Sequence, residues 1–290
     1  MVLKILAPAK INLALEIFEK VKNSSYHNVD MILQSVSLFD VVELSTCETD
    51  EILVESDKDL NCSAKNNICY KVAKKFFDYT GIKNYGIKIR IKKSIPISAG
   101  LAGGSSDGAA VLVGMNEIFK AGLSQTELCK IGGKVGADIP FCIVGGTARA
   151  KGIGTEICKI ESKVDFYVVI VNPDISVSTA LAYEKIDSFK ILDFFDVNKL
   201  ENSIKSSDAE EISKNLFNRF EKIIDEEKTE KIKKLLKENG SISSLMSGSG
   251  PSVYGIFKDK TKAEIWFENI KKIYPKTFLC NFISHGAKIL

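Results

Sequence analysis

The chain has 290 residues, of which 40 are basic and 37 acidic, giving a formal net charge of +3. This balance leaves no field strong enough to favour nucleic acid as the main partner, and the length suits two modest domains. Seven scattered cysteines include no Cys-x-x-Cys pair, which argues against a disulfide framework or a zinc site. The first residues lack a signal-peptide pattern, and no apolar run reaches the length of a membrane span. We therefore expect a cytoplasmic protein with no membrane partner.

The first elements alternate between strand and helix. Residues 10–17 place apolar side chains at every second position, which predicts a half-buried strand, and further strands are expected at 41–44 and 52–55. Residues 67–79 carry apolar side chains at helical spacing and stop before Gly81. The alternating segment 85–92 then predicts a strand that leads into a glycine-rich loop.

The glycine-rich loop is the most informative segment, and it consists of Pro96, Ile97, Ser98, Ala99, Gly100, Leu101, Ala102, Gly103, Gly104, Ser105 and Ser106. Glycine lets the backbone approach a ligand and adopt positive φ. Ser105, Ser106 and Asp107 are candidate N-caps for the helix that follows. Because free amides at a helix N-terminus bind anions, the strand–loop–helix order predicts a phosphate site in a nucleotide enzyme.

The second half is richer in lysine and in helical patterns. The loop helix is expected to run from about Ser106 to near Gly122, with Ser124 capping another helix. A buried strand is predicted at 165–173, helices at 209–224, 228–239 and 262–274, and strands at 253–257 and 278–282. A change of domain is expected somewhere in the range 150–165.

Three common nucleotide signatures are missing. The chain has no Gly-x-x-x-x-Gly-Lys-Ser/Thr motif and no Gly-x-Gly-x-x-Gly that follows a first strand. The His-Arg-Asp and Asp-Phe-Gly motifs of protein kinases are also missing. The loop therefore belongs to another class of phosphate-binding protein.

Five segments together resemble the GHMP kinase superfamily, whose members phosphorylate small-molecule hydroxyls with ATP. They are Pro8-Ala9-Lys10-Ile11-Asn12-Leu13, Tyr26-His27, the loop Pro96–Ser106, Gly136-Ala137-Asp138-Ile139-Pro140 and Ser247-Gly248-Ser249-Gly250-Pro251-Ser252. The resemblance runs nearly end to end and implies an α+β fold of two domains. Residues 1–158 would form a domain like domain 2 of ribosomal protein S5, and residues 159–290 a ferredoxin-like domain.

Within the superfamily, the first, second and fourth segments resemble one branch in particular. That branch phosphorylates the 2-hydroxyl of 4-diphosphocytidyl-2-C-methyl-D-erythritol in non-mevalonate isoprenoid biosynthesis, so the implied substrate is a cytidine diphosphate-linked methylerythritol. A mevalonate- or homoserine-type kinase and a nucleotide-binding scaffold without catalysis are the alternatives. Ser24-Ser25 stands where the branch usually has Asp-Gly. Gly108 replaces a frequent alanine, at a cost of about 1 kcal/mol to the helix.

The resemblance implies that Asp138 and Lys10 are the catalytic residues. Asp138 would accept the hydroxyl proton, and Lys10 would stabilise charge on the transferred phosphoryl group. The structural alternatives are an aspartate that caps the turn before Pro140 and an ordinary exposed strand lysine. Lys10 shares one face of its strand with Asn12, so that face is expected to line a cleft.

The remaining site residues are also implied by the resemblance. Asn12, Tyr26, His27, Thr179 and Tyr183 would bind the substrate, with Tyr26 and Tyr183 stacking on the cytosine and His27 hydrogen-bonding it. Packing in the core is the alternative for the aromatic residues, and a polar surface position is the alternative for Asn12.

The ATP site would comprise the loop together with Asn67 and Lys93, for which a helix N-cap and a strand-end lysine are the alternatives. The turn 247–250 either closes the site from the second domain or is a plain turn between strands. ATP and Mg²⁺ are the expected cofactors, with Ser105, Ser106 or Asp107 near the ion and no dedicated metal ligands. The protein is expected to be a monomer or a homodimer that binds no nucleic acid.

Overall fold

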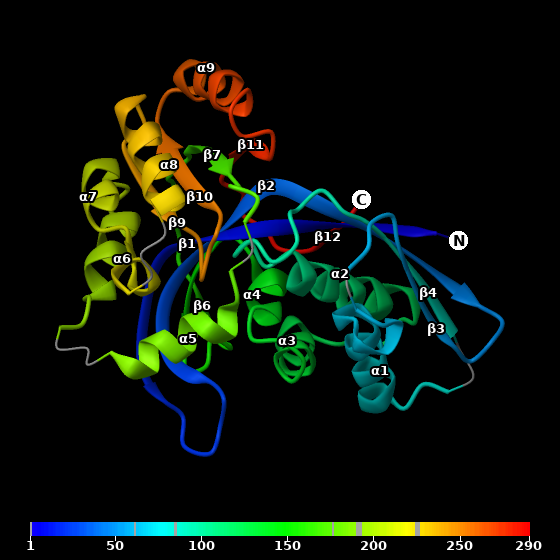
Figure 1. Ribbon diagram of the computed structural model, residues 1–290. Coiled ribbons are helices and arrows are strands. Elements are labelled where there is room, and N and C mark those ends of the chain that lie inside the picture. The colour runs from blue at the N-terminus through cyan, green and yellow to red at the C-terminus, as the bar shows by residue number, and fades with distance from the viewer. Residues whose placement is uncertain (1, 61, 84–85, 176, 190–192, 224–226) are drawn as a thin grey trace.

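The computed structural model describes residues 2–60, 62–83, 86–175, 177–189, 193–223 and 227–290 (Figure 1). The strands are β1 (Leu3–Lys20), β2 (His27–Cys47), β3 (Ile52–Ser56), β4 (Gly86–Lys92), β5 (Thr147–Lys151), β6 (Glu156–Lys159), β7 (Tyr167–Val171), β8 (Phe217–Asn218), β9 (Ser243–Met246), β10 (Val253–Phe257), β11 (Thr277–Asn281) and β12 (Lys288–Ile289). The α-helices are α1 (Ile68–Thr80), α2 (Gly103–Ile118), α3 (Gln125–Gly133), α4 (Ile139–Val144), α5 (Thr179–Ser188), α6 (Val197–Lys205), α7 (Ala209–Lys214), α8 (Glu227–Glu238) and α9 (Lys260–Lys271), and short 3₁₀ turns lie at Ala64–Asn66 and Arg219–Lys222.

The larger sheet is built on the long antiparallel pair β1 and β2. In the described part of the chain its order is β12-β1-β2-β4-β3, while β5 pairs with β2 and β6, and β8 pairs with β1. Helices α1 to α4 lie together on one side of this sheet (Figure 1). Their apolar faces bury Phe76, Val111 and Phe141 against sheet residues such as Ile5 and Leu44. Burial of this apolar area is the main stabilising contribution to the layer.

The smaller sheet has the antiparallel order β11-β7-β10-β9. Alternate residues of β7 point to opposite faces, as in any strand. Val169 and Val171 join the core under α8 and α9, whereas Val168 and Ile170 join a core that contains Ile11 of β1. The two sheets are therefore joined by an apolar interface.

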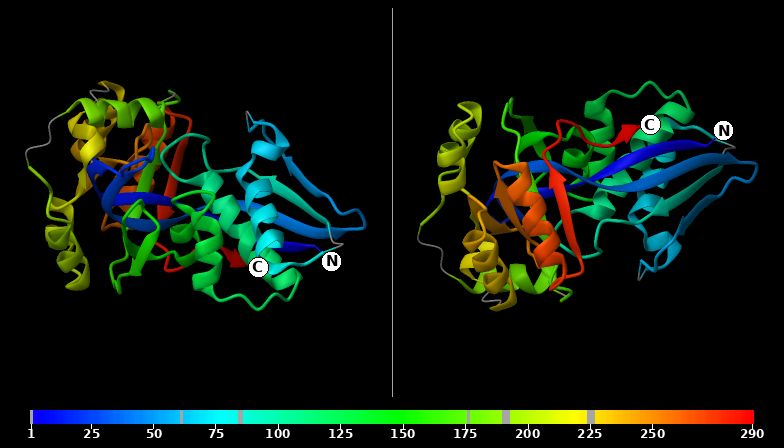
Figure 2. Two further views of the ribbon diagram at one scale, coloured as in Figure 1. Left: turned by 90° about the horizontal axis from the view of Figure 1, so that it is seen from below. Right: turned by 90° about the horizontal axis from the view of Figure 1, so that it is seen from above.

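The two ends of the chain meet at the larger sheet. Ile5 of β1 pairs with Ile289 of β12, and both termini lie near the same edge in the two views of Figure 2.

The predicted boundary at 158/159 falls within β6. Two later strands, β8 and β12, return to β1 of the larger sheet.

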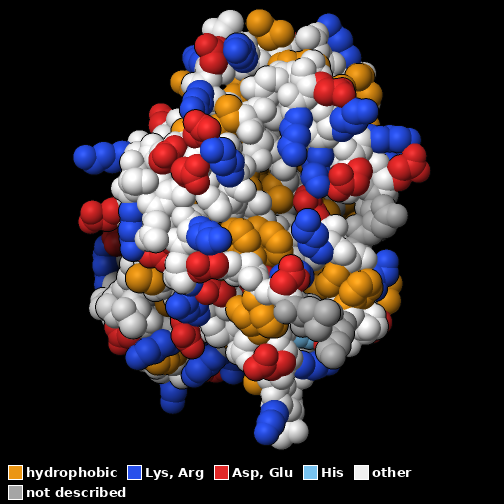
Figure 3. Space-filling model, turned by 90° about the vertical axis from the view of Figure 1, so that its left-hand side faces the viewer, with side chains coloured by type: hydrophobic (Ala, Val, Ile, Leu, Met, Phe, Trp, Pro, Cys, Tyr) orange, Lys and Arg blue, Asp and Glu red, His pale blue; other side chains and the backbone are white. Residues whose placement is uncertain are grey.

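On the face that carries α6 and α7, basic and acidic side chains are interspersed, as Figure 3 shows.

Most of the predicted elements are confirmed. The helix predicted at 67–79 is α1, with Asn67 as its N-cap and Gly81, at φ 70°, as its C-cap. Ser124 caps α3 in a capping box with Glu127. The strands predicted at 10–17 and 41–44 are parts of the longer β1 and β2. Tyr85, in the segment predicted as a strand at 85–92, lies outside the described residues.

Two helix predictions are wrong in extent. Instead of one helix at 209–224, α7 ends at Lys214, and Phe217–Asn218 pairs with β1 as β8. The Asn218 side chain then accepts a hydrogen bond from the Phe220 amide, which starts a 3₁₀ turn in place of a continuing helix. Ile224 lies outside the described residues. The loop helix α2 ends at Ile118, before the expected Gly122.

Candidate functional site

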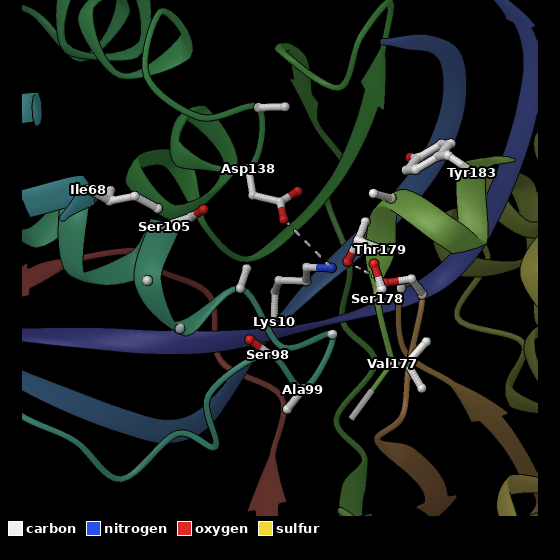
Figure 4. Close-up of a pocket in the computed structure, with 18 of the residues that line it drawn as sticks. Lys10, Ile68, Ser98, Ala99, Ser105, Asp138, Val177, Ser178, Thr179 and Tyr183 are labelled. Carbon is white, nitrogen blue, oxygen red and sulfur yellow. Dashed lines mark hydrogen bonds and ion pairs between the residues drawn. The ribbon is translucent and has the colours of Figure 1, made fainter. Parts of the chain in front are cut away.

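A cavity of about 1090 Å³ lies where the glycine-rich loop, β1, β2 and α5 meet (Figure 4). All of the predicted site residues line it except Leu101 and Ser106. Leu101 is buried in the core, and the Ser106 hydroxyl donates to the Pro8 carbonyl at 2.7 Å. Residues from both halves of the sequence therefore contribute to one cavity, and two loop residues support its wall.

The glycine-rich loop turns sharply before α2. Ser98, Gly100 and Ala102 have φ values of 52°, 76° and 54°, and α2 starts at Gly103 with Ala102 at the N-cap position. The N-cap prediction for Ser105, Ser106 and Asp107 is therefore wrong, because these residues lie inside the helix. Ala102 provides no side-chain cap. The first amides of α2 thus have no capping side chain, and with the positive end of the helix dipole they suit an anion in the cavity.

A turn from the second half of the chain packs against this loop. The Ser247 hydroxyl donates to the Gly100 carbonyl at 2.9 Å, and the Ser252 amide donates to the Ala99 carbonyl at 3.3 Å. A Cβ on Gly100 would lie 2.1 Å from the Ser247 carbonyl oxygen. Only glycine fits there, so the loop and the turn at 247–252 form one wall.

Lys10 and Asp138 face each other across the cavity (Figure 4). The Lys10 Nζ lies 4.0 Å from the Asp138 Oδ2 and 2.7 Å from the Asn12 Oδ1 that accepts its hydrogen bond. Lys10 is only 4% exposed, so it is no ordinary surface lysine. Asp138 stands at the N-cap position of α4, but its side chain makes no cap hydrogen bond. Neither structural alternative explains these two side chains, and the pair can receive a proton and stabilise negative charge.

Lys93 is held behind the glycine-rich loop by two buried carboxylates. Its Nζ donates to Asp40 and, at 2.7 Å, to Asp107. Burial by itself lowers the pKa of Lys93. The attraction and hydrogen bonds of Asp107 and Asp40 have a larger effect, so the Lys93 pKa is raised overall. Burial also raises the pKa of Asp107 well above its usual range. The Asp107 Oδ1 is buried and has no hydrogen-bond partner among the described residues.

Asn67 and Lys93 both have structural roles as well as positions on the cavity wall. The Asn67 side chain accepts a hydrogen bond from the Cys69 amide at 2.7 Å and caps α1. Lys93 joins the end of β4 to β2 and α2 through its two carboxylates. Their contact with a nucleotide stays a prediction.

The aromatic residues gather at the other end of the cavity. Tyr26 is 47% exposed, whereas His27 is buried and its ring stacks on Tyr183 with centroids 4.9 Å apart. Burial, with a smaller contribution from Asp138, raises the pKa of Tyr183 to about 12. The Thr179 hydroxyl lies 2.9 Å from that of Ser249. Four of the predicted substrate residues are therefore brought together, and Asn12 lies beside Lys10.

One cavity residue that the sequence analysis missed is Asp187. Its Oδ1 accepts a hydrogen bond from the His27 Nε2 at 2.7 Å, and its Oδ2 lies 3.5 Å from the Lys20 Nζ. Asp187 follows Tyr183 by four positions, and residues four apart share a helix face. This spacing could have indicated from the sequence that Asp187 lies on the same face of the helix as Tyr183.

Within the described ranges, no group of three or more His, Cys, Asp or Glu side chains is arranged to hold a metal ion. In the same residues, no helix combines the length and the apolar character needed to cross a bilayer.

Comparison with known proteins gives matches along nearly the whole chain. The family models described as GHMP kinases N terminal domain and GHMP kinases C terminal match residues 67–146 and 200–276. A 4-diphosphocytidyl-2-C-methyl-D-erythritol kinase from Clostridium tetani is 41% identical, over 97% of this chain and 100% of that protein. One from Caldicellulosiruptor bescii is 38% identical, over 98% and 99%.

Two solved structures share the fold. A 4-(cytidine 5'-diphospho)-2C-methyl-D-erythritol kinase has a TM-score of 0.78 at 23% identity, covering 96% of this chain and 98% of its own. A homoserine kinase from Cytophaga hutchinsonii has a TM-score of 0.79 at 18% identity, covering 100% and 97%. At these identities the structures bear on the fold alone, and they agree with the expected two-domain α+β class.

Proposed function

The chain belongs to the GHMP kinases, in the family of 4-diphosphocytidyl-2-C-methyl-D-erythritol kinases, and we propose that it transfers the γ-phosphoryl group of ATP to the 2-hydroxyl of 4-diphosphocytidyl-2-C-methyl-D-erythritol. The products are the 2-phosphate and ADP. The observation that carries the proposal is the pair Lys10 and Asp138, 4.0 Å apart in a cavity bounded by the glycine-rich loop.

The chemistry at this pair follows from the two side chains. Asp138 accepts the proton of the 2-hydroxyl as its oxygen bonds to the γ-phosphorus, and the bond from that phosphorus to the β–γ bridging oxygen breaks. Lys10, held by Asn12, stabilises negative charge on the entering oxygen and the phosphoryl group. Because Lys10 is buried, water screens its charge weakly.

The donor end of the cavity is assigned to ATP. The first amides of α2 and the loop at 96–106 bind the phosphates, and Asn67 and Lys93 lie near the rest of the nucleotide. Ser105 and Asp107 line the same wall, and the Oδ1 of Asp107 lacks a partner among the described residues. These oxygens suit Mg²⁺, which prefers oxygen ligands and would neutralise charge on the phosphates when bound.

The acceptor end is assigned to the cytidyl group. Tyr26 and Tyr183 offer ring faces for stacking, and His27 and Thr179 offer polar atoms. Mevalonate and homoserine have no nucleobase to stack on such rings, so these side chains favour the cytidyl substrate. We also propose that the enzyme is cytoplasmic, acts as a monomer or homodimer and needs no nucleic acid.

The experiment is an ADP-release assay with 4-diphosphocytidyl-2-C-methyl-D-erythritol, mevalonate and homoserine as separate acceptors. Turnover is expected with the first, and activity only with one of the other two would overturn the assignment. Asp138→Ala is expected to lower kcat at least about 100-fold with ATP affinity nearly unchanged. Asp165→Ala removes an exposed carboxylate outside the cavity and is the matched control. Tight ATP binding without transfer to any acceptor would support a scaffold instead.

A further inference from the structure

Helix α5 forms one wall of the cavity and is held near both ends. In its first turn the Thr179 hydroxyl meets that of Ser249, 2.9 Å away. In its last turn Asp187 meets His27 of β2 at 2.7 Å and Lys20 of β1 at 3.5 Å. The helix therefore bridges the turn at 247–252 and the β1–β2 hairpin.

The sequence of α5 does not by itself favour a carboxylate at Asp187. Aspartate is a poor helix former, and a negative charge in the last turn is repelled by the helix dipole. The partners across the cavity compensate for both effects. The hydrogen bond from His27, with Lys20 adding to it, lowers the pKa of Asp187 and keeps it charged.

This contact also determines the state of the His27 ring. The ring is nearly fully buried, and a carboxylate can only accept a hydrogen bond, so the Nε2 must carry a proton. In the neutral ring the Nδ1 is then an acceptor. The Nδ1 is buried and has no hydrogen-bond partner in the described part of the chain. The same ring packs against Tyr183, so its plane and the position of α5 are linked.

We infer that Asp187 is a positioning residue for the acceptor end of the cavity. It fixes the tautomer of His27 and holds α5, and with it Tyr183, against the β1–β2 hairpin. The side-chain contacts of Asp187 are to His27 and Lys20 and not to Lys10 or Asp138. The inference rests on the proposed function, because His27 and Tyr183 are assigned there to the cytidyl group.

The first test is kinetic. Asp187→Ala is expected to raise the KM for the cytidyl acceptor about five- to tenfold, a discounted value because Asp187 is partly exposed. The kcat and the KM for ATP are expected to stay within about twofold. Asp187→Asn, whose amide oxygen can still accept from the Nε2, is expected to give a smaller rise. Lys185→Ala changes an exposed side chain of the same helix and is the control.

The second test reads the ring directly and does not depend on turnover. The chain has two histidines, so ¹⁵N–¹H correlation spectra of the imidazoles contain His27 and one reference, His285. The wild-type protein is expected to show His27 protonated at Nε2, and Asp187→Ala is expected to show a mixture of tautomers, with His285 unchanged. A changed tautomer with an unchanged KM, or an unchanged tautomer, would overturn the positioning role. A wild-type protein that does not accept the cytidyl substrate would overturn the proposed function, while the spectra would still test the contact.

Discussion

Glu16 and Arg219 form a buried, bidentate ion pair between β1 and the second half of the chain. The Arg219 Nε donates to the Glu16 Oε1 at 2.7 Å, and its Nη2 donates to the Glu16 Oε2 at 2.6 Å. The Oε2 also accepts from the Phe195 amide, and Glu16 is fully buried. Since 203 positions separate the partners, this pair fixes how the two halves pack.

Breaking this pair is expected to destabilise the fold. Arg219→Met leaves the Glu16 carboxylate buried without its cation, which typically costs about 3–5 kcal/mol of the free energy of unfolding. Glu16→Met combined with Arg219→Met is expected to cost less, because no buried charge remains. Urea unfolding followed by circular dichroism measures both. A double variant less stable than Arg219→Met would contradict this account.

Removing the Lys10 charge is expected to slow transfer without weakening ATP binding. Lys10→Met is predicted to lower kcat about 100- to 1000-fold, since a preorganised cation stabilises charge that develops in the transition state. Lys10→Arg is expected to retain more activity. Steady-state kinetics separate the parameters. A rise in the KM for ATP with unchanged kcat would place Lys10 in nucleotide binding instead.

Gly100→Ala is expected to separate the glycine-rich loop from the turn at 247–252. The added Cβ would lie 2.1 Å from the Ser247 carbonyl oxygen, so the backbone must move, and the KM for ATP is expected to rise. Gly122→Ala is the matched control. Gly122 also has a positive φ, of 66°, but a Cβ there meets nothing within 4 Å. That variant should cost only backbone strain, about 1 kcal/mol, with unchanged kinetics. Equal kinetic effects in both variants would contradict the role of the contact.

The stability of Asp107→Asn relative to the wild-type protein is expected to increase as the pH rises above about 4. Burial raises the pKa of Asp107 above its unfolded value near 3.9, so the native state binds an extra proton above that pH. Wild-type stability therefore falls with rising pH until Asp107 is ionised in the native state, by up to about 1.4 kcal/mol per unit. The variant keeps the pair Lys93 and Asp40 but lacks this dependence.

Glu43→Gln is the control for this pH series, because the pKa of Glu43 is shifted in the opposite direction to that of Asp107. Hydrogen bonds from Lys4 and Lys92 lower the pKa of Glu43, so its contribution is present above the unfolded pKa and is lost as the pH falls through the native pKa. Thermal unfolding across pH 2 to 8 measures both variants and covers the range below the unfolded pKa of Glu43. A stability of Asp107→Asn that falls relative to the wild-type protein as the pH rises would contradict the prediction.

Gly108 shows why a sequence-based estimate of helix stability was incomplete. By helix propensity alone, this residue costs about 1 kcal/mol relative to alanine. In the structure a Cβ on Gly108 would lie 2.7 Å from the Ile68 Cγ2. Close packing of α1 on α2 therefore requires glycine there, and no local propensity reports that contact.

The sequence by itself determined the elements whose signals are local. The N-cap Asn67, the C-cap Gly81 and the apolar spacing between them specify α1 within a few residues. The alternation in β1 places Lys10 and Asn12 on one face, because the strand period is two. The glycine-rich loop predicted a phosphate site because its glycines and the start of the following helix lie within one short segment.

Only the tertiary structure decided which of these residues meet. The 4.0 Å distance from Lys10 to Asp138, the start of α2 at Gly103 and the contact from Asp187 to His27 join positions far apart in the chain or depend on packing. Local propensities act over a few residues, whereas burial and charge pairing depend on the path of the whole chain. The loop therefore predicted a phosphate site, and the fold determined that Lys10 and Asp138 line the same cavity as the loop.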